Sequence, residues 1–137
     1  MSVKIKNIIP LIIERDRNHH FWGRITVNDN LIIESAASKQ ALIDKLKRLA
    51  LDFEDVKITE FDIAYDLSAF FEEYAFLNIS DIAKKSGINQ SLMRQYATGI
   101  KFPSEERVKQ IQEAIRTIGK ELAKIKIVKP NIHLEEA

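Results

Sequence analysis

Cysteine is absent from this chain of 137 residues, which excludes disulfides, thiolate metal ligands and a cysteine nucleophile. Glycine and proline are scarce, at 4 and 3 residues, and no stretch rich in them marks a flexible linker. Long hydrophobic runs are also missing, since the apolar stretch from Ile8 to Ile13 is interrupted by Pro10 and ends at Glu14. That stretch is too short for a signal sequence or a membrane span, so we expect no membrane association and a cytoplasmic location.

Hydrophobic residues make up 45% of the chain and charged residues 30%, a balance typical of a globular protein with a folded core. The net charge is only +1, but it is unevenly distributed. Residues 1–66 hold 10 Lys and Arg against 11 Asp and Glu, whereas residues 67–129 hold 11 against 7. The second half is therefore the basic part of the chain, where contact with a negatively charged partner is more favourable.

The first half of the chain alternates between strand and helix patterns. Ser38 is a suitable helix N-cap, and apolar residues recur after it at helical spacing. The other segments are rich in β-branched and aromatic residues, which favours strands, with a bend at Pro10 and a bulge near Glu60 expected. The order β-β-β-α-β predicts a small sheet with a helix on one face. The predicted strands are Val3–Ile13, Phe21–Val27, Leu31–Ile33 and Val56–Tyr65, and the predicted helix is Lys39–Phe53.

The second half loses the strand pattern and is predicted to be helical. One helix begins at Leu67, and Asn78 and Ser104 are suitable N-caps for later helices. We therefore expect an α+β protein, with an α/β domain at 1–66, an all-α domain at 67–128 and a tail at 129–137. The last helix carries a long apolar stripe, which either serves self-association or packs back onto the first domain through Leu122 and Ile125. The stripe comprises Val108, Ile111, Ile115, Ile118, Leu122 and Ile125.

The segment 78–103 has the pattern of a helix-turn-helix. Gly87 can adopt the left-handed conformation that a tight turn between two helices requires. Ala83 is small enough for the helices to approach closely, and Asn89 is a plausible N-cap for the second helix. On that helix four polar side chains share the face away from the core, and their residue types can read base edges in the major groove. These predicted base contacts are Gln90, Ser91, Arg94 and Gln95.

Other polar residues around this segment could hold DNA phosphates, which positions a protein without reading the sequence. The predicted phosphate contacts are Asn78, Ser80, Lys84, Lys85, Thr98 and Lys101. The alternative interpretation is a plain helical hairpin that binds no nucleic acid.

The spacing of small and basic residues in this segment resembles the Xre/Cro family of helix-turn-helix repressors. The resemblance rests on Ile82-Ala83, Gly87-Ile88-Asn89, Gly99, Lys101 and Pro103-Ser104. It implies that the segment binds operator DNA and that the four polar residues named above contact bases. The chain departs from the family pattern at Ile79, where relatives often carry a phosphate-binding Gln, and at Ala97, which replaces a frequent Glu.

Residues 3–66 resemble the N-terminal domain of HicB-type antitoxins, which has a truncated ribonuclease H fold. The likeness rests on the order β-β-β-α-β, on Phe21-Trp22-Gly23-Arg24, and on the position of this domain before a helix-turn-helix. It implies that the N-terminal domain blocks a small RNA-cleaving toxin and that the protein represses its operon as a dimer or higher oligomer. Phe21 and Trp22 would then be anchors for the toxin, because aromatic residues dominate such interfaces. The alternative is that both belong to the core. The chain lacks the longer Pro-Gly-Cys loop that relatives often carry before the third strand.

We expect no catalytic residues, no metal and no cofactor. Ribonuclease H chemistry needs several carboxylates around a divalent metal, and the acids Asp16, Glu60, Asp62 and Asp66 do not form an evident cluster in the sequence. His19-His20 has no third ligand at a sensible spacing. A stand-alone regulator without a toxin and a metal-dependent nuclease are the alternatives to an antitoxin.

Overall fold

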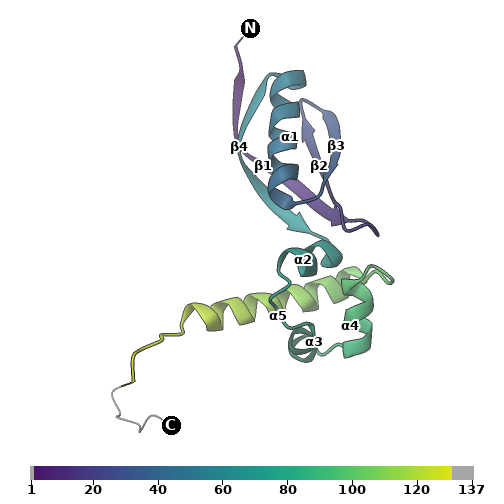
Figure 1. The fold of residues 1–137 in the computed structure, drawn as a ribbon, viewed down its shortest axis with the longest axis vertical. Coiled ribbons are helices and arrows are strands. Elements are labelled where there is room, and N and C mark those ends of the chain that lie inside the picture. The colour runs from purple at the N-terminus through teal and green to yellow at the C-terminus, as the bar shows by residue number, and fades with distance from the viewer. Residues whose placement is uncertain (1, 131–137) are drawn as a thin grey trace.

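The computed structural model describes residues 2–130 and shows an α+β protein with a four-stranded mixed sheet and five helices (Figure 1). The predicted tail 129–137 therefore lies almost wholly outside the described residues. No helix within residues 2–130 has both the length and the apolar character needed to cross a lipid bilayer. The elements are β1 (Lys4–Arg15), β2 (Phe21–Val27), β3 (Asn30–Ala36), α1 (Lys39–Glu54), β4 (Val56–Tyr65), α2 (Leu67–Glu73), α3 (Ile79–Ser86), α4 (Gln90–Ala97) and α5 (Glu105–Ala123).

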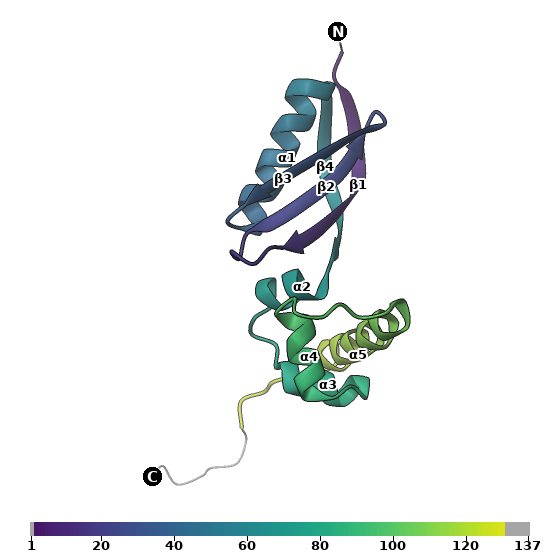
Figure 2. The ribbon, with the colours of Figure 1, turned by 90° about the vertical axis from the view of Figure 1, so that its right-hand side faces the viewer.

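The sheet has the order β3-β2-β1-β4, with β4 parallel to β1 and the other neighbours antiparallel. The register places Pro10 of β1 opposite Asp62 of β4, so β1 continues through the proline. The helix α1 connects β3 to β4 and packs on one face of the sheet, as Figure 2 shows. This arrangement confirms the predicted element order and the helix on one face.

The first hydrophobic core lies between the sheet and α1. Alternation along the strands turns Leu11, Ile13 and Ile25 toward α1, where Leu42 and Leu46 are fully buried. Gly23 lies directly under the helix, since a Cβ atom there would be 3.0 Å from the side chains of both leucines. The close approach of α1 to β2 therefore depends on the missing side chain at this position.

Helices α2 to α5 enclose a second hydrophobic core. Each of these four helices carries the N-cap that its first turn requires, because Asp66, Asn78, Asn89 and Ser104 each accept a hydrogen bond from a backbone N–H of the following helix. The buried members of this core are Phe71, Ile82, Ala83, Ile88, Met93, Tyr96, Ala97 and Ile111.

Two predicted strands are shorter than the strands in the structure. The third strand is longer than predicted because β3 pairs with β2 from Asn30 to Ala36, and this pairing orders residues that have little strand propensity of their own. The first strand extends to Arg15, beyond the expected end at Ile13, because Glu14 and Arg15 pair with Trp22 and Phe21. In both cases a neighbouring strand supplies the hydrogen bonds that local propensity does not predict.

Candidate functional site

The candidate site is the pair of helices α3 and α4 with the tight turn between them. Gly87 ends α3 with a φ of 70°, and its N–H donates to the carbonyls of Ala83 and Lys84. Asn89 then caps α4, with its side-chain oxygen accepting a 2.8 Å hydrogen bond from the N–H of Ser91. Ile88, between them, is buried in the second core. The predicted left-handed glycine and the predicted asparagine cap are both confirmed.

The two faces of α4 have opposite character. Met93, Tyr96 and Ala97 are buried against the second core. Gln90, Ser91 and Arg94 lie on the other side and are exposed, whereas Gln95 is half-buried. Three of the four predicted base contacts are therefore brought together on one open face, and Gln95 lies at its edge. Figure 1 places α3 and α4 at the far end of the molecule from the sheet.

Arg94 connects the two helices of the site. Its Nη2 donates to the hydroxyl of Ser80 on α3 at 3.3 Å. Ser80 was expected to contact phosphate, so the structure brings a predicted base contact and a predicted phosphate contact within hydrogen-bond distance. The guanidinium remains exposed and has further donors for a ligand.

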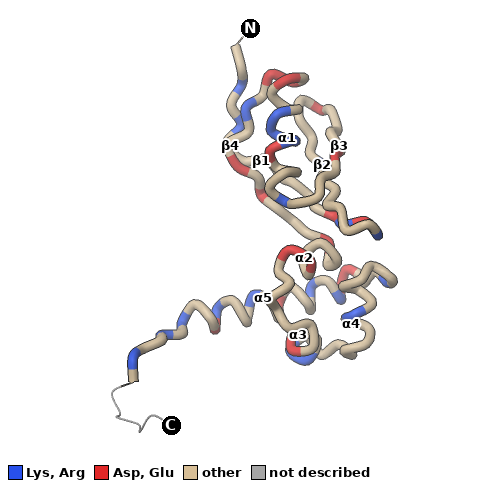
Figure 3. The backbone as a smooth tube through the Cα atoms, in the orientation of Figure 1, with Lys and Arg blue, Asp and Glu red and all other residues tan. Residues whose placement is uncertain are grey.

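The other predicted phosphate contacts differ in whether their side chains already make contacts within the protein. Lys84 is exposed in the last turn of α3, whereas Lys85 forms an ion pair with Glu121 of α5 at 3.4 Å. The side chain of Asn78 caps α3, and the Thr98 hydroxyl donates to the carbonyl of Arg94 at 3.0 Å, so both contribute to local structure. Lys101 is exposed in the loop between α4 and α5. Figure 3 shows the basic positions of α3 and α4 close together at one end of the molecule.

Phe21 and Trp22, the predicted partner contacts, point to opposite faces of the sheet. Phe21 is 5% exposed and belongs to the first core, so the expectation that it anchors a partner is wrong. The reason is the two-residue period of a strand, which turns neighbouring side chains to opposite faces. Trp22 is 42% exposed on the face that α1 does not cover.

Asp16 holds the ring of Trp22 in place. A carboxylate oxygen accepts a 2.8 Å hydrogen bond from the indole Nε1, and the other oxygen accepts from the backbone N–H groups of Asn18 and His20. These bonds favour the charged form of the carboxyl, and the one from Trp22 makes the largest contribution to a lowered pKa of Asp16. Both oxygens of the Asp16 carboxylate therefore stabilise the turn after β1 and the position of the Trp22 ring.

The sheet face around Trp22 carries exposed apolar residues that were not predicted as a site. In the register of the sheet, Ile12 of β1 lies beside Arg24 of β2, which lies beside Ile33 of β3. Ile12, Ile33 and Leu31 are all exposed. The sequence signal was the run of consecutive apolar residues at 31–33, because a strand that is apolar at every position presents apolar side chains on both faces.

The four acids considered for metal chemistry have separate environments. Asp16 bonds Trp22, Asp66 caps α2, and Glu60 and Asp62 are exposed on β4. Within residues 2–130 the side chains of His, Asp and Glu form no group of three or more that could hold a metal ion.

Comparison of the chain with known protein families, with curated protein sequences and with solved structures gave no significant match.

Proposed function

We propose that the protein is a transcriptional repressor that binds operator DNA through a helix-turn-helix formed by α3 and α4. The observation that supports this most directly is the exposed face of α4, where Gln90, Ser91 and Arg94 project together while the opposite face is buried. An α-helix fits the major groove of B-form DNA, and these residue types match the donors and acceptors of base edges. The resemblance of this segment to Xre/Cro repressors supports the same assignment.

The roles of the side chains follow from their chemistry and position. Arg94 would pair with the O6 and N7 atoms of guanine, and Gln90 with the N6 and N7 atoms of adenine. The Ser80 hydroxyl accepts a hydrogen bond from the Arg94 guanidinium and so orients it before DNA binds. The arginine side chain therefore loses less conformational entropy on binding. Lys84 would contact a phosphate and contribute affinity that is independent of sequence.

The test is a binding titration of the purified full-length protein on the DNA upstream of its gene. Arg94→Ala should lose roughly 1–3 kcal/mol of binding free energy, and the loss should be concentrated at one base position. Lys84→Ala should weaken binding to all sequences alike and reduce the salt dependence by about one unit. Arg48→Ala, an exposed arginine on α1, is the matched control and should leave the isotherm unchanged. Equal affinity of wild type and Arg94→Ala for every sequence would count against the assigned face.

The exposed apolar sheet face favours a second activity, that of an antitoxin. We propose that this face binds a small RNA-cleaving toxin, as the likeness of residues 3–66 to HicB-type antitoxins implies. Trp22, Ile12 and Ile33 would form the contact, since aromatic and large apolar side chains anchor protein interfaces and these three are exposed. Phe21 is not part of it, because it lies in the core.

Where a short reading frame lies beside this gene, co-expression of its product with this protein tests the antitoxin role. Wild type should restore growth if that reading frame encodes a toxin, and Ile33→Asp should fail to restore it because a charge would be buried in the contact. The control is Asp52→Ala, which changes an exposed residue of α1 away from this sheet face and should still protect. Protection by Ile33→Asp would contradict this surface. No effect on growth by the neighbouring product would favour a stand-alone regulator.

A further inference from the structure

The last helix of the chain extends beyond the core on which it packs. Its apolar stripe advances by alternating steps of three and four residues, a spacing that keeps the side chains on one face. In the middle of the helix Ile111 is buried in the second core. Further along, Leu122 is 57% exposed and Ile125, just past the helix end, is 59% exposed. Packing of these two residues onto the sheet domain, one of the two alternatives for the stripe, is therefore wrong.

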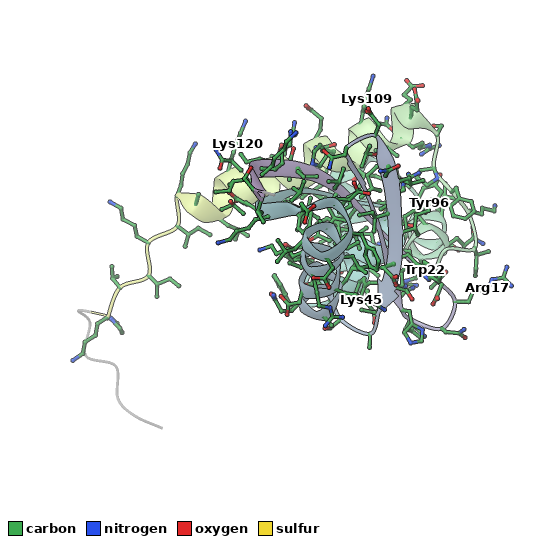
Figure 4. All side chains as sticks on the ribbon, turned by 90° about the horizontal axis from the view of Figure 1, so that it is seen from above. Arg17, Trp22, Lys45, Tyr96, Lys109 and Lys120 are labelled. Carbon is green, nitrogen blue, oxygen red and sulfur yellow. The ribbon has the colours of Figure 1, made fainter. Side chains whose placement is uncertain are left out.

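The segment that follows α5, residues 124–130, carries exposed apolar side chains between lysines. We name it the C-terminal arm. Ile127 is 93% exposed, and Val128 is exposed beside it. The arm leaves the body of the molecule from the end of α5, close to Lys120, and its side chains extend into solvent on the side opposite Trp22 and Arg17 (Figure 4). Three isoleucine and valine side chains within so short a segment are seldom left in water, because their burial is favourable.

A cavity of about 590 Å³ lies near the other end of α5, between its first turns, the end of β4 and α2. Its lining is mainly aromatic and aliphatic, with Asp66, Lys101 and Arg116 as the charged residues. We name it the hinge groove because it lies where the sheet meets the helices. The apolar residues that line it include Tyr65, Phe70, Tyr96, Phe102, Val108 and Ile115. Phe102 is highly exposed, so the mouth of the groove is apolar as well.

The arm and the hinge groove lie on either side of Gly119 along the same helix. Val108 lies 11 residues before Gly119 and Ile127 lies 8 residues after it. At 1.5 Å per helical residue, Val108 lies roughly 17 Å from Gly119, and at about 3.3 Å per extended residue Ile127 can reach up to roughly 20 Å from it in the other direction. A two-fold axis at Gly119 would therefore bring the arm of one copy within reach of the hinge groove of another. A Cβ at Gly119 would meet nothing within 4 Å, so the helix surface there is open to a second helix.

We propose that two copies of this chain pair antiparallel along α5 and exchange their arms, each arm filling the hinge groove of the other copy. The exchange buries Ile125, Ile127 and Val128 against the aromatic side chains of the groove. One symmetric contact then covers both the arm and the mouth of the hinge groove, because the two-fold axis makes each copy give its arm and receive the arm of the other. The lysines that alternate with the arm isoleucines stay at the surface, away from Lys101 and Arg116 of the groove.

Disulfide trapping tests this contact directly, because the natural chain has no cysteine and therefore no background. A mixture of full-length Val108→Cys and full-length Ile127→Cys should give a covalent heterodimer under mild oxidation. A double variant carrying both cysteines should give a doubly linked dimer. Arg48→Cys mixed with Ile127→Cys is the control and should remain monomeric on a non-reducing gel. A disulfide within one chain of the double variant, which would show the arm in its own groove, would overturn the proposal.

Sedimentation of the unmodified full-length protein gives an independent measurement. Wild type should have twice the monomer mass of 15.8 kDa. The double variant Ile125→Asp/Ile127→Asp should raise the dimer dissociation constant by at least about 100-fold, since buried large apolar anchors carry most of the affinity of an interface. Lys126→Ser, between the two isoleucines, should change it by less than about threefold. A monomeric wild type, or a dimer that tolerates both aspartates, would refute arm exchange. Neither result depends on DNA binding.

Discussion

Arg15 at the end of β1 donates a 2.8 Å hydrogen bond from its Nε to the hydroxyl of Ser68, a buried residue of α2 that lies 53 positions later in the chain. Its Nη2 also donates to the carbonyl of Ala97 at the end of α4, and its Nη1 pairs with Glu72. One guanidinium therefore connects the sheet to two helices of the second core. A planar group with several fixed donors suits this position, which an amine on a flexible stem could not occupy equally well.

Arg15→Ala should destabilise the protein by about 2–3 kcal/mol, because it leaves buried acceptors without a partner. Arg15→Lys should recover only part of this loss, since one ammonium cannot bond all three partners at their present positions. The measurement is urea unfolding followed by circular dichroism. Arg17→Ala, in the neighbouring exposed turn, is the control and should stay within about 0.5 kcal/mol of wild type. A value for Arg15→Ala within that range would show that the two cores are held together by other contacts.

Two glycines should respond to substitution for different reasons. A Cβ atom at position 87 would meet no atom within 4 Å, but the backbone there has a φ of 70°. Gly87→Ala should therefore lower the free energy of unfolding by about 1–2 kcal/mol through backbone strain alone. Gly23→Ala places its Cβ 3.0 Å from the Leu42 and Leu46 side chains and should cost about 1–3 kcal/mol from overpacking. Substitution by asparagine distinguishes backbone strain from overpacking, because asparagine tolerates the left-handed region better than alanine does but has a larger side chain. Thermal unfolding should show Gly87→Asn milder than Gly87→Ala, and Gly23→Asn worse than Gly23→Ala; the opposite order at either site would contradict the assigned cause.

Asp66 makes stability depend on pH. Burial raises the pKa of its carboxyl above the ordinary 3.8, and Glu14 acts in the same direction, while the Ala69 N–H and Arg15 oppose the shift. The folded state thus binds this proton more tightly than the unfolded chain does. The resulting stabilisation is fully present below pH 3.8 and is lost as the pH rises through the raised folded pKa.

Asp66→Asn keeps the oxygen that caps α2 and removes the ionisation. The free energy of unfolding of this variant, relative to wild type, should therefore increase between about pH 3 and pH 7. Asp66→Ala loses the cap as well and should be less stable than Asp66→Asn by about 1 kcal/mol at every pH in that range. Parallel pH profiles for wild type and Asp66→Asn would show that this carboxyl is not perturbed.

Trp22 is the single tryptophan of the chain, so its fluorescence reports on its bond to Asp16. The hydrogen bond from the indole lowers the pKa of Asp16, and the bond is therefore present above the ordinary pKa of 3.8 and lost as the pH falls through the lowered value. The emission should change with a midpoint below pH 3.8, and Asp16→Ala should show the acid-like spectrum already at neutral pH. An emission midpoint above 3.8 in wild type would exclude this bond as the cause.

Local patterns in the sequence predicted the elements whose signals span only a few residues. The caps at Ser38, Asn78, Asn89 and Ser104 were confirmed because capping is a bond between a side chain and a backbone N–H two or three residues away. The left-handed conformation of Gly87 was predictable for the same reason. The base-reading role of α4 and the antitoxin role of the sheet domain remain predictions.

The sequence by itself determined the order of strands and helices, the turn at Gly87 and the polar face of α4, because these depend on alternation, helical spacing and capping within one segment. Only the tertiary structure decided that Phe21 is buried while Trp22 is exposed, that Arg15 reaches Ser68, and that Leu122 projects beyond the core. Each of these depends on which distant segment packs against which face. Residues far apart in the chain meet through the sum of many weak contacts, and no short pattern records that sum.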